Sequence, residues 1–385
     1  MAIERDNLGG SWPTAGGDNA RTGYSRDSVK PPLRVVWEYT DCDWIQGGIV
    51  VDEGVVVAGD RQGVLHAVSA AAGSRLWTCP LGGFVTGTPA ISAGHVFAAS
   101  SREALCLDLH SGSPIWSCAL PHVPDFPIAT PGAVLVAGGR VFMPMEIGVA
   151  VFDAESGELV DRLAPGSGSS ANAGVCCDED DLYVPNEREL ICIVGGAVST
   201  QFLGGKITCG PVVGGDLLLF GSNYHTVEAI KLRDLQSAWS SSGGEASDYA
   251  SLLESRPAFA QGKVVFGGVD GCVYAVDAAS GGPAWRTDLG ADITAPVAIA
   301  GDHVYALATD GLRALRLSDG EIVWSFFAAG RDEAINSPPA VAGGMVFVAW
   351  RSLWALAEGR KSEPRHEIEW GDENRLNDPY GDPNW

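Results

Sequence analysis

The chain has 385 residues, 50 of them Gly and 22 Pro, and its 48 acidic residues outnumber 25 Lys and Arg to give a net charge of −23 at pH 7. This charge excludes nucleic acids and anionic membrane surfaces as partners, because both bind basic patches. No apolar run is long enough to span a bilayer, and residues 1–6 lack the basic and apolar parts of a secretion signal. We therefore expect a cytoplasmic protein.

The first element in chain order is a lead-in arm at residues 1–33, and a strand-like run from Arg34 to Tyr39 follows it. After this run, one motif returns eight times at a spacing of roughly 40 residues, which is typical of propeller blades. The cleanest copy, from Ser255 to Trp285, reads as four short strands separated by turns. Turn anchors recur in the eight copies at Gly54, Gly94, Gly139, Asp181, Gly215, Gly262, Gly301 and Gly343.

The last copy, from Ser337 to Leu356, stops before its fourth strand. The run from Arg34 to Tyr39 has the sequence of that missing strand, and pairing it with the last copy would remove an open sheet edge. We therefore predict an all-β fold: an eight-bladed β-propeller of four-stranded antiparallel blades at residues 34–357, closed by an N-terminal strand. Residues 358–385 form an acidic tail with aromatic side chains, which is either a strap packed on the propeller or a docking peptide for a partner.

The repeat resembles that of the pyrroloquinoline-quinone (PQQ)-type propellers, through its Asp-Gly turn, its Ala-Val-Asp strand end and its Gly-x-x-x-Trp hairpin. The lead-in from Ser11 to Tyr24 is similar to a segment common in that family. The resemblance implies the fold, but the family includes quinoprotein dehydrogenases, assembly lipoproteins and sensor domains, so the function has to come from the residues themselves.

The resemblance also raises the question of PQQ, which quinoprotein alcohol dehydrogenases hold beside calcium and against a disulfide between adjacent cysteines. Here Cys176 and Cys177 are adjacent, but successive side chains of a strand point to opposite faces. No set of acidic side chains for calcium and no His/Cys cluster with metal-ligand spacing is evident. We expect no cofactor and no metal.

The innermost strand of each blade lines the axial channel, so the equivalent positions of the eight copies predict a ring. Seven of the eight residues at these positions are polar: Gln46, Thr86, Asn172, Thr208, Glu254, Thr294 and Asn336, with Ala129 as the exception. Such a ring either satisfies backbone groups and holds water or forms the lining of a ligand site. Trp44 and Tyr249 lie just upstream of ring positions and are added to the predicted ligand-binding residues.

Charged residues near this ring are the candidates for chemistry. Glu254 and Arg256, two apart in a strand, either pair with each other or leave Glu254 as the best general base. His122, in a Pro-rich loop, is the second catalytic candidate. Tyr249 belongs to a Ser/Gly-rich insert beside Glu254, which is either a flexible linker or a lid.

Two functional hypotheses follow. The first is a binding module that takes an unidentified small molecule, peptide or partner protein at its axial funnel. The second is a cofactor-independent enzyme of a specialised biosynthetic pathway with its active site at the funnel mouth. The first is favoured, because the sequence shows no recognisable pair of nucleophile and base.

Overall fold

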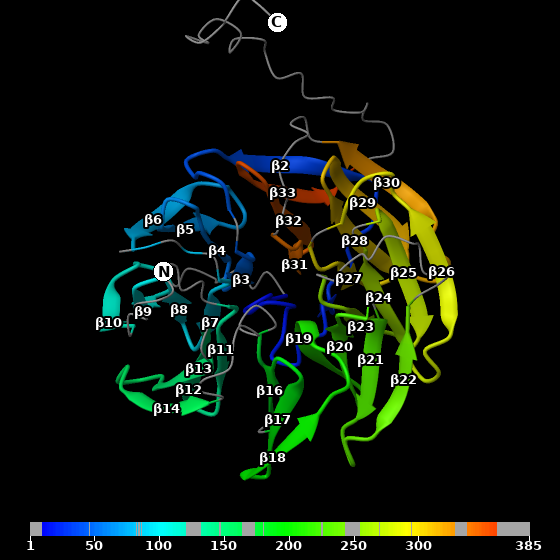
Figure 1. The fold of residues 1–385 in the computed structure, drawn as a ribbon. Coiled ribbons are helices and arrows are strands. Elements are labelled where there is room, and N and C mark those ends of the chain that lie inside the picture. The colour runs from blue at the N-terminus through cyan, green and yellow to red at the C-terminus, as the bar shows by residue number, and fades with distance from the viewer. Residues whose placement is uncertain are drawn as a thin grey trace, which may run out of the picture.

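The computed structural model describes residues 10–45, 47–81, 83, 85, 87–120, 132–145, 148–163, 174–179, 181–224, 226–242, 255–268, 270–293, 295–327 and 337–359. This part of the chain contains strands and no helix, and the strands form eight sheets arranged as a ring (Figure 1). The predicted eight-bladed propeller of four-stranded antiparallel blades is therefore confirmed. Within the described residues, no helix is of a length and apolarity that would cross a membrane.

In the first four blades each strand pairs antiparallel with its neighbour in the chain, from the inner strand to the outer one. The strands of blade one are β3 (Val50–Asp52), β4 (Val55–Gly59), β5 (Val64–Ser69) and β6 (Arg75–Pro80). Blade two has β7 (Ala90–Ser92), β8 (His95–Ala99), β9 (Glu103–Asp108) and β10 (Pro114–Ala119). Blade three has β11 (Leu135–Ala137), β12 (Arg140–Met145), β13 (Gly148–Asp153) and β14 (Leu159–Leu163). Blade four has β15 (Cys176–Asp178), β16 (Asp181–Asn186), β17 (Glu189–Val194) and β18 (Ala197–Phe202).

Blades five to seven repeat this order, and blade eight borrows its outer strand from the other end of the chain. Blade five has β19 (Ile207–Gly214), β20 (Leu217–Ser222), β21 (Thr226–Lys231) and β22 (Ser237–Ser241). Blade six has β23 (Ala258–Ala260), β24 (Lys263–Gly267), β25 (Cys272–Asp277) and β26 (Pro283–Asp288). Blade seven has β27 (Ala298–Ala300), β28 (His303–Ala308), β29 (Gly311–Arg316) and β30 (Ile322–Phe327), with the short β1 (Tyr24–Ser25) added inside β27. Blade eight has β31 (Ala340–Ala342), β32 (Met345–Ala349), β33 (Leu353–Glu358) and β2 (Leu33–Tyr39).

The ring closes as the sequence predicts, because β2 pairs antiparallel with β33. Trp37 lies opposite Ala355, and Tyr39 lies opposite Leu353. Figure 1 shows β2 in blue lying along β33 in orange. The start and the end of the propeller are thus held in one sheet, which leaves no gap in the ring.

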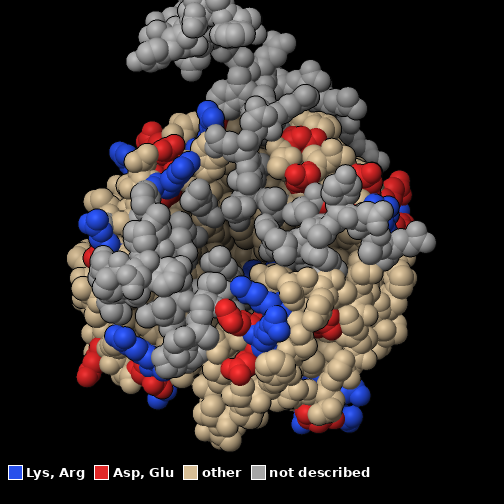
Figure 2. All heavy atoms as spheres, viewed as in Figure 1, with Lys and Arg blue, Asp and Glu red and all other residues tan. Residues whose placement is uncertain are grey.

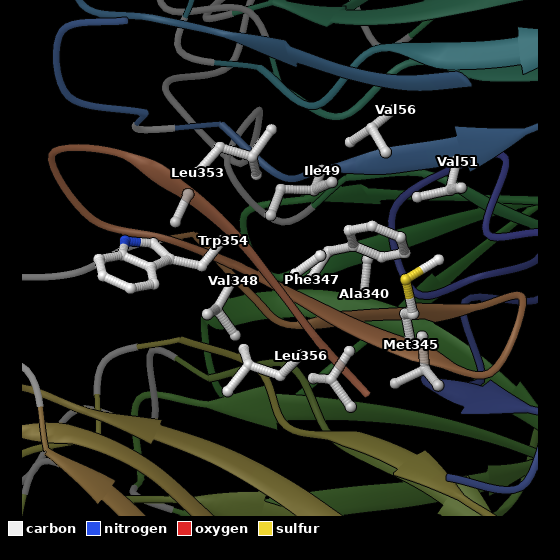
Figure 3. Packing of buried hydrophobic residues seen from close by; sticks show 14 of the residues in the cluster. Ile49, Val51, Val56, Ala340, Met345, Phe347, Val348, Leu353, Trp354 and Leu356 are labelled. Carbon is white, nitrogen blue, oxygen red and sulfur yellow. The ribbon is translucent and has the colours of Figure 1, made fainter. Parts of the chain in front are cut away.

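The junctions between blades are packed by apolar side chains from both blades. At the junction where the ring closes, Val51 and Val56 of blade one lie in the same buried cluster as Phe347, Trp354 and Leu356 of blade eight. Figure 3 shows Val51 and Val56 on the blue ribbons and Phe347 facing them from the orange ribbon, with Leu356 on the other side of the orange strand. Because inner and middle strands are buried on both sides, they read as continuous apolar runs rather than as an alternating pattern.

The Gly-x-x-x-Trp hairpin of the repeat joins each blade to the next. The indole Nε1 of Trp285, in the outer strand of blade six, donates a hydrogen bond of 2.9 Å to the carbonyl of Leu317 in blade seven. Gly320 of blade seven packs on the same indole, and a Cβ there would come within 2.5 Å of the ring. The same pairing of indole and glycine recurs for Trp37 with Gly73, Trp77 with Gly112, Trp116 with Gly157, and Trp239 with Gly281.

The outer strands of blades three and four lack this tryptophan. β14 and β18 have the sequences Leu-Val-Asp-Arg-Leu and Ala-Val-Ser-Thr-Gln-Phe, and most of their residues are exposed. The repeat is therefore degraded in blades three and four, and the hydrogen bond from an outer-strand indole to the next blade is missing at two successive junctions.

Candidate functional site

The lead-in arm runs around the inside of the ring. Seven inner strands each hydrogen-bond to it through one residue: Val51, Ile91, Val136, Cys177, Val213, Phe259 and Ile299. The partners on the arm follow the same order along the chain: Trp12, Pro13, Asn19 twice, Ala20, Thr22 and Gly23. In Figure 1 the dark blue start of the chain lies at the centre of the ring.

The remaining part of the arm extends these contacts to the eighth blade. The backbone N–H of Gly344, in the turn between β31 and β32, donates a hydrogen bond of 3.4 Å to the Asp27 carboxylate. The hydroxyl of Tyr305 donates to the carbonyl of Val29 at 2.6 Å. All eight blades therefore contact a single segment, which lines the inside of the ring.

Arg21 is the central side chain of the arm and is 1% exposed. Its Nε donates to the carbonyl of Val175 at 3.0 Å, and Nη1 donates to Thr14 Oγ1 and to the carbonyl of Ala15. Nη2 donates to the carbonyls of Ala133 and Val134 at 3.4 and 3.0 Å. All five N–H groups of the guanidinium are used on uncharged acceptors from the arm and from blades three and four.

A second guanidinium, that of Arg256, lies near the first. Burial and the positive charge of Arg256 lower the pKa of Arg21 to about 9, while Cys176, Cys177 and Asp18 act in the opposite sense. Burial also lowers the pKa of Arg256, and Cys209, Cys176 and Asp18 oppose that shift. The closed end of the channel thus holds two positive charges and the single carboxylate of Asp18 among the described residues.

Asp18 is itself engaged within the arm. Its Oδ1 accepts a hydrogen bond of 2.9 Å from the backbone N–H of Thr22, and its Oδ2 accepts one of 2.6 Å from the Thr22 hydroxyl. These bonds hold the turn from which Arg21 projects, so the carboxylate is oriented by the arm rather than by a guanidinium.

Of the predicted site residues, the structure describes Trp44, Thr208 and Arg256. Thr208 is partly exposed within β19, and Arg256 precedes β23. The other predicted residues lie outside the described residues: Gln46, Thr86, His122, Asn172, Tyr249, Glu254, Thr294 and Asn336. Inner strands of blades one, six and seven begin at Val50, Ala258 and Ala298, so the positions expected to form the ring precede these strands.

Trp44 contacts a charged residue, but not Arg256. The guanidinium of Arg351 lies 5.2 Å from the centre of the Trp44 ring. Trp44 itself has a left-handed backbone with φ of 53°, and its carbonyl accepts a hydrogen bond from the N–H of Arg61. This contact joins the connection before blade one to the turn between β32 and β33.

A buried network of titratable side chains lies at the junction of blades eight and one, and the sequence did not indicate it. Tyr39 Oη and His66 Nδ1 are 3.0 Å apart, and His66 Nε2 is 2.9 Å from Asp60 Oδ2. Burial raises the pKa of Asp60, but hydrogen bonds from His66, Val64 and Asp43 outweigh that effect and the pKa is lowered. The network links β2, β5 and the turn after β4, so its role is structural.

The adjacent cysteines of β15 do not form a disulfide. Cys176 packs in the cluster shared with blade five, whereas Cys177 packs in the cluster shared with blade three. The two thiols therefore point to opposite sides of β15, as expected, and all nine cysteines are free. Among the described residues no three His, Cys, Asp or Glu side chains group as a metal site.

Arg21 and Asp18 belong to the site, although sequence reasoning assigned them no role. They lie in a polar lead-in without hydrophobic periodicity, and the blades that supply Arg21's acceptors are more than a hundred positions away. Arg256, in contrast, lies two residues after the ring position Glu254 and could be identified from the repeat.

Comparison with known proteins supports the propeller fold. A family model described as outer membrane protein assembly factor BamB matches residues 28–241 and 269–362. The curated protein of that name from Burkholderia pseudomallei (strain K96243) is 31% identical over 115 residues, which are 30% of this chain and 28% of that protein. The match therefore spans less than a third of that relative.

Two solved structures cover most of the chain. The quinohemoprotein alcohol dehydrogenase from Comamonas testosteroni superposes with a TM-score of 0.73 at 13% identity, over 94% of this chain and 83% of that one. The quinohemoprotein alcohol dehydrogenase ADHIIG from Pseudomonas putida HK5 gives a TM-score of 0.74 at 13% identity, over 94% and 82%. At this identity the likeness shows the fold alone.

Proposed function

Because the chain belongs to the BamB-like family of PQQ-type propellers, we propose that it is a binding module whose ligand enters the end of the axial channel opposite the arm. It acts without PQQ. The observation that carries this proposal is the path of the arm, which hydrogen-bonds to seven inner strands around the inside of the ring. We infer that the arm closes the channel at that level.

A channel closed at one level is a pocket with a single mouth. Ligand pockets in proteins are concave and usually preformed, and they combine apolar walls with a few polar groups that fix orientation. Here the inner strands supply the apolar walls, Thr208 near the start of β19 supplies a polar group toward the mouth, and Arg256 supplies one at the closed end. The positions expected to form the ring precede the inner strands, so we expect the mouth to be where side chains from many blades meet one ligand.

Two features support a cytoplasmic protein without PQQ. All nine cysteines are free thiols, and six of them are buried, as is typical of a reducing compartment. Burial raises the pKa of Cys176 well above its ordinary value, so it is an inert thiol rather than half of a reactive pair.

The test is a thermal-shift screen of the full chain against small carboxylates, phosphates, amino acids and sugars, followed by hydrogen–deuterium exchange with the strongest hit. A ligand that binds only the native state raises the melting temperature. We expect protection in peptides that contain Thr208 and Arg256, and none in the exposed outer strand β18. Protection confined to outer strands would refute the proposal. PQQ with Ca²⁺ serves as the negative control, and a saturable shift with it would refute the assignment of a PQQ-free protein.

A further inference from the structure

The closed end of the axial channel has an excess of positive charge in a protein whose net charge is −23. Arg21 and Arg256 lie within electrostatic range of each other, and Asp18 is the carboxylate that acts on both. One carboxylate balances one guanidinium, so among the described residues a second positive charge is left without a counter-ion. A buried charge without a partner is costly unless a ligand neutralises it.

The two arginines differ in what they can bind. The five N–H groups of Arg21 are all donated to the protein, so this side chain is a structural centre of the arm. No hydrogen bond or ion pair to the Arg256 guanidinium occurs among the described residues, and part of this side chain is accessible to solvent. Arg256 therefore has donors available for a ligand.

The position of Arg256 follows from the elements that surround it. Arg256 precedes β23 of blade six, yet it lies within electrostatic range of Cys209 of β19, Cys176 of β15 and Asp18 of the arm. Inner strands of blades four, five and six and the arm approach a common point only at the axis of the ring. Arg256 consequently projects into the channel, directly above the arm, where the backbone N–H of Phe259 donates to the carbonyl of Thr22 at 2.7 Å.

We propose that Arg256 binds a small oxyanion, a carboxylate or phosphate group of the ligand, at the closed end of the axial channel. This inference rests on the proposed function, because it names the ligand class of the same pocket. A planar guanidinium with two parallel donors matches a carboxylate or a phosphate in a bidentate geometry. Arg21, held rigidly behind it, adds positive potential without competing for the ligand.

Basic side chains at the mouth give an entering anion a favourable path. Arg188 directly precedes β17 and is exposed, and Lys206 directly precedes β19. The backbone N–H of Leu203 donates to the carbonyl of Arg188 at 2.7 Å, which joins the turn before β17 to the connection before β19. Figure 2 shows blue side chains over β16 and β19 at the edge of the central hollow, with red acidic side chains beside them. The positive side chains at this edge attract an entering anion.

The experiment is isothermal titration of the full chain with sodium malonate, sodium phosphate and sodium chloride at constant ionic strength. We expect saturable binding of malonate or phosphate and none of chloride; a preference for malonate assigns a carboxylate ligand, and a preference for phosphate assigns a phosphorylated one. Arg256→Met should weaken binding at least about tenfold, because a charge-assisted hydrogen-bond pair is lost. Arg256→Lys should retain part of the affinity.

The matched control is Arg316→Met, since Arg316 is exposed and is already paired with Asp319 and Glu321 at 2.7 Å. It should bind the anion as the unaltered protein does. A second readout needs no ligand: in anion-free buffer Arg256→Met should raise the melting temperature, because it removes an unbalanced charge beside Arg21.

Two outcomes overturn the inference. One is the absence of saturable malonate or phosphate binding, and the other is a lower melting temperature of Arg256→Met in anion-free buffer, which would assign Arg256 to a structural ion pair such as one with Glu254. The proposed function fails separately, if the ligand found by screening protects only outer strands while malonate binding still depends on Arg256.

Discussion

Arg21 and Val175 are 154 positions apart, and the Nε of the first donates a hydrogen bond of 3.0 Å to the carbonyl of the second. This bond ties the lead-in arm to the residue before the inner strand of blade four. Together with the bonds to Val134 and Ala15, this bond holds in place the arm, a segment that contacts every blade. The arm is therefore part of the propeller's core and not an appendage of it.

Replacing Arg21 should destabilise the protein. Arg21→Met leaves the carbonyls of Val175 and Ala15 buried without their donors, and each such group costs about 1–3 kcal/mol. We expect the free energy of unfolding in urea to fall by about 2–4 kcal/mol. Arg21→Lys should recover only part of this loss, because an ammonium has three donors and cannot reach acceptors on opposite sides.

The control for this substitution is Arg316→Lys, at an exposed arginine whose exchange should change the free energy of unfolding by less than about 0.5 kcal/mol. Equal stability of Arg21→Met and the unaltered protein would show that the arm is not fastened to the ring by this side chain.

The indole hydrogen bonds between blades should be measurable one at a time. Trp285→Phe keeps an aromatic ring against Gly320 but leaves the carbonyl of Leu317 without its donor. We expect a loss of about 1–3 kcal/mol in urea unfolding. Trp350→Phe is the matched control, because the Nε1 of Trp350 is buried and has no partner among the described residues. If both variants lose equal stability, ring volume rather than the hydrogen bond holds the blades together.

The glycine that packs on each indole can be tested within blade two. Gly112 has φ of 68°, and a Cβ there would lie 2.6 Å from the Trp77 ring. Gly94 has a similar φ of 74°, but a Cβ there would meet nothing within 4 Å. Both Ala variants carry the left-handed penalty of about 1–2 kcal/mol. Gly112→Ala should have a clearly lower melting temperature than Gly94→Ala, and equal melting temperatures would contradict close packing of Gly112 on the indole.

The buried Asp60 should make stability depend on pH in the acid range. Hydrogen bonds from His66, Val64 and Asp43 outweigh burial, so the folded pKa of Asp60 is below its ordinary value of 3.8. The folded state then binds fewer protons than the unfolded state, and stability rises with pH. The contribution is fully present above pH 3.8 and is lost as the pH falls through the folded pKa.

This dependence is measured by comparing Asp60→Asn with the unaltered protein in thermal melts between pH 5 and pH 3. The unaltered protein should lose melting temperature more steeply than the variant, whose side chain does not titrate. Parallel curves would mean that Asp60 has the same pKa in both states.

The fold could be predicted because the repeat is strong where two blades meet. The strand from Arg34 to Tyr39 was identified by its position and by Trp37, and it pairs with β33 as predicted. Strand bounds were harder to predict: the ring positions Gln46 and Glu254 were placed in the inner strands, whereas β3 begins at Val50 and β23 at Ala258. Gly48 and Pro257 precede these two strands, and Gly and Pro interrupt strand pairing.

The site could be predicted in part. Arg256 lies beside a ring position of the repeat, so its role as a ligand-binding residue stays a prediction with structural support. Arg21 lies outside the repeat, and its hydrogen-bond acceptors come from blades three and four, so its role could not be predicted from its position. The path of a segment that crosses the axis depends on long-range contacts, and these do not show in the local pattern of a lead-in.

The central claim is that the arm closes one end of the channel, so that a ligand reaches Arg256 from the other end alone. The most direct measurement is residue-resolved hydrogen exchange of five inner-strand amides that donate to the arm: Ile91, Cys177, Val213, Phe259 and Ile299. We predict that all five exchange as slowly as amides within the blades, because their acceptors are arm carbonyls. Exchange of these five at the rate of unprotected amides, with the blades still protected, would contradict the account.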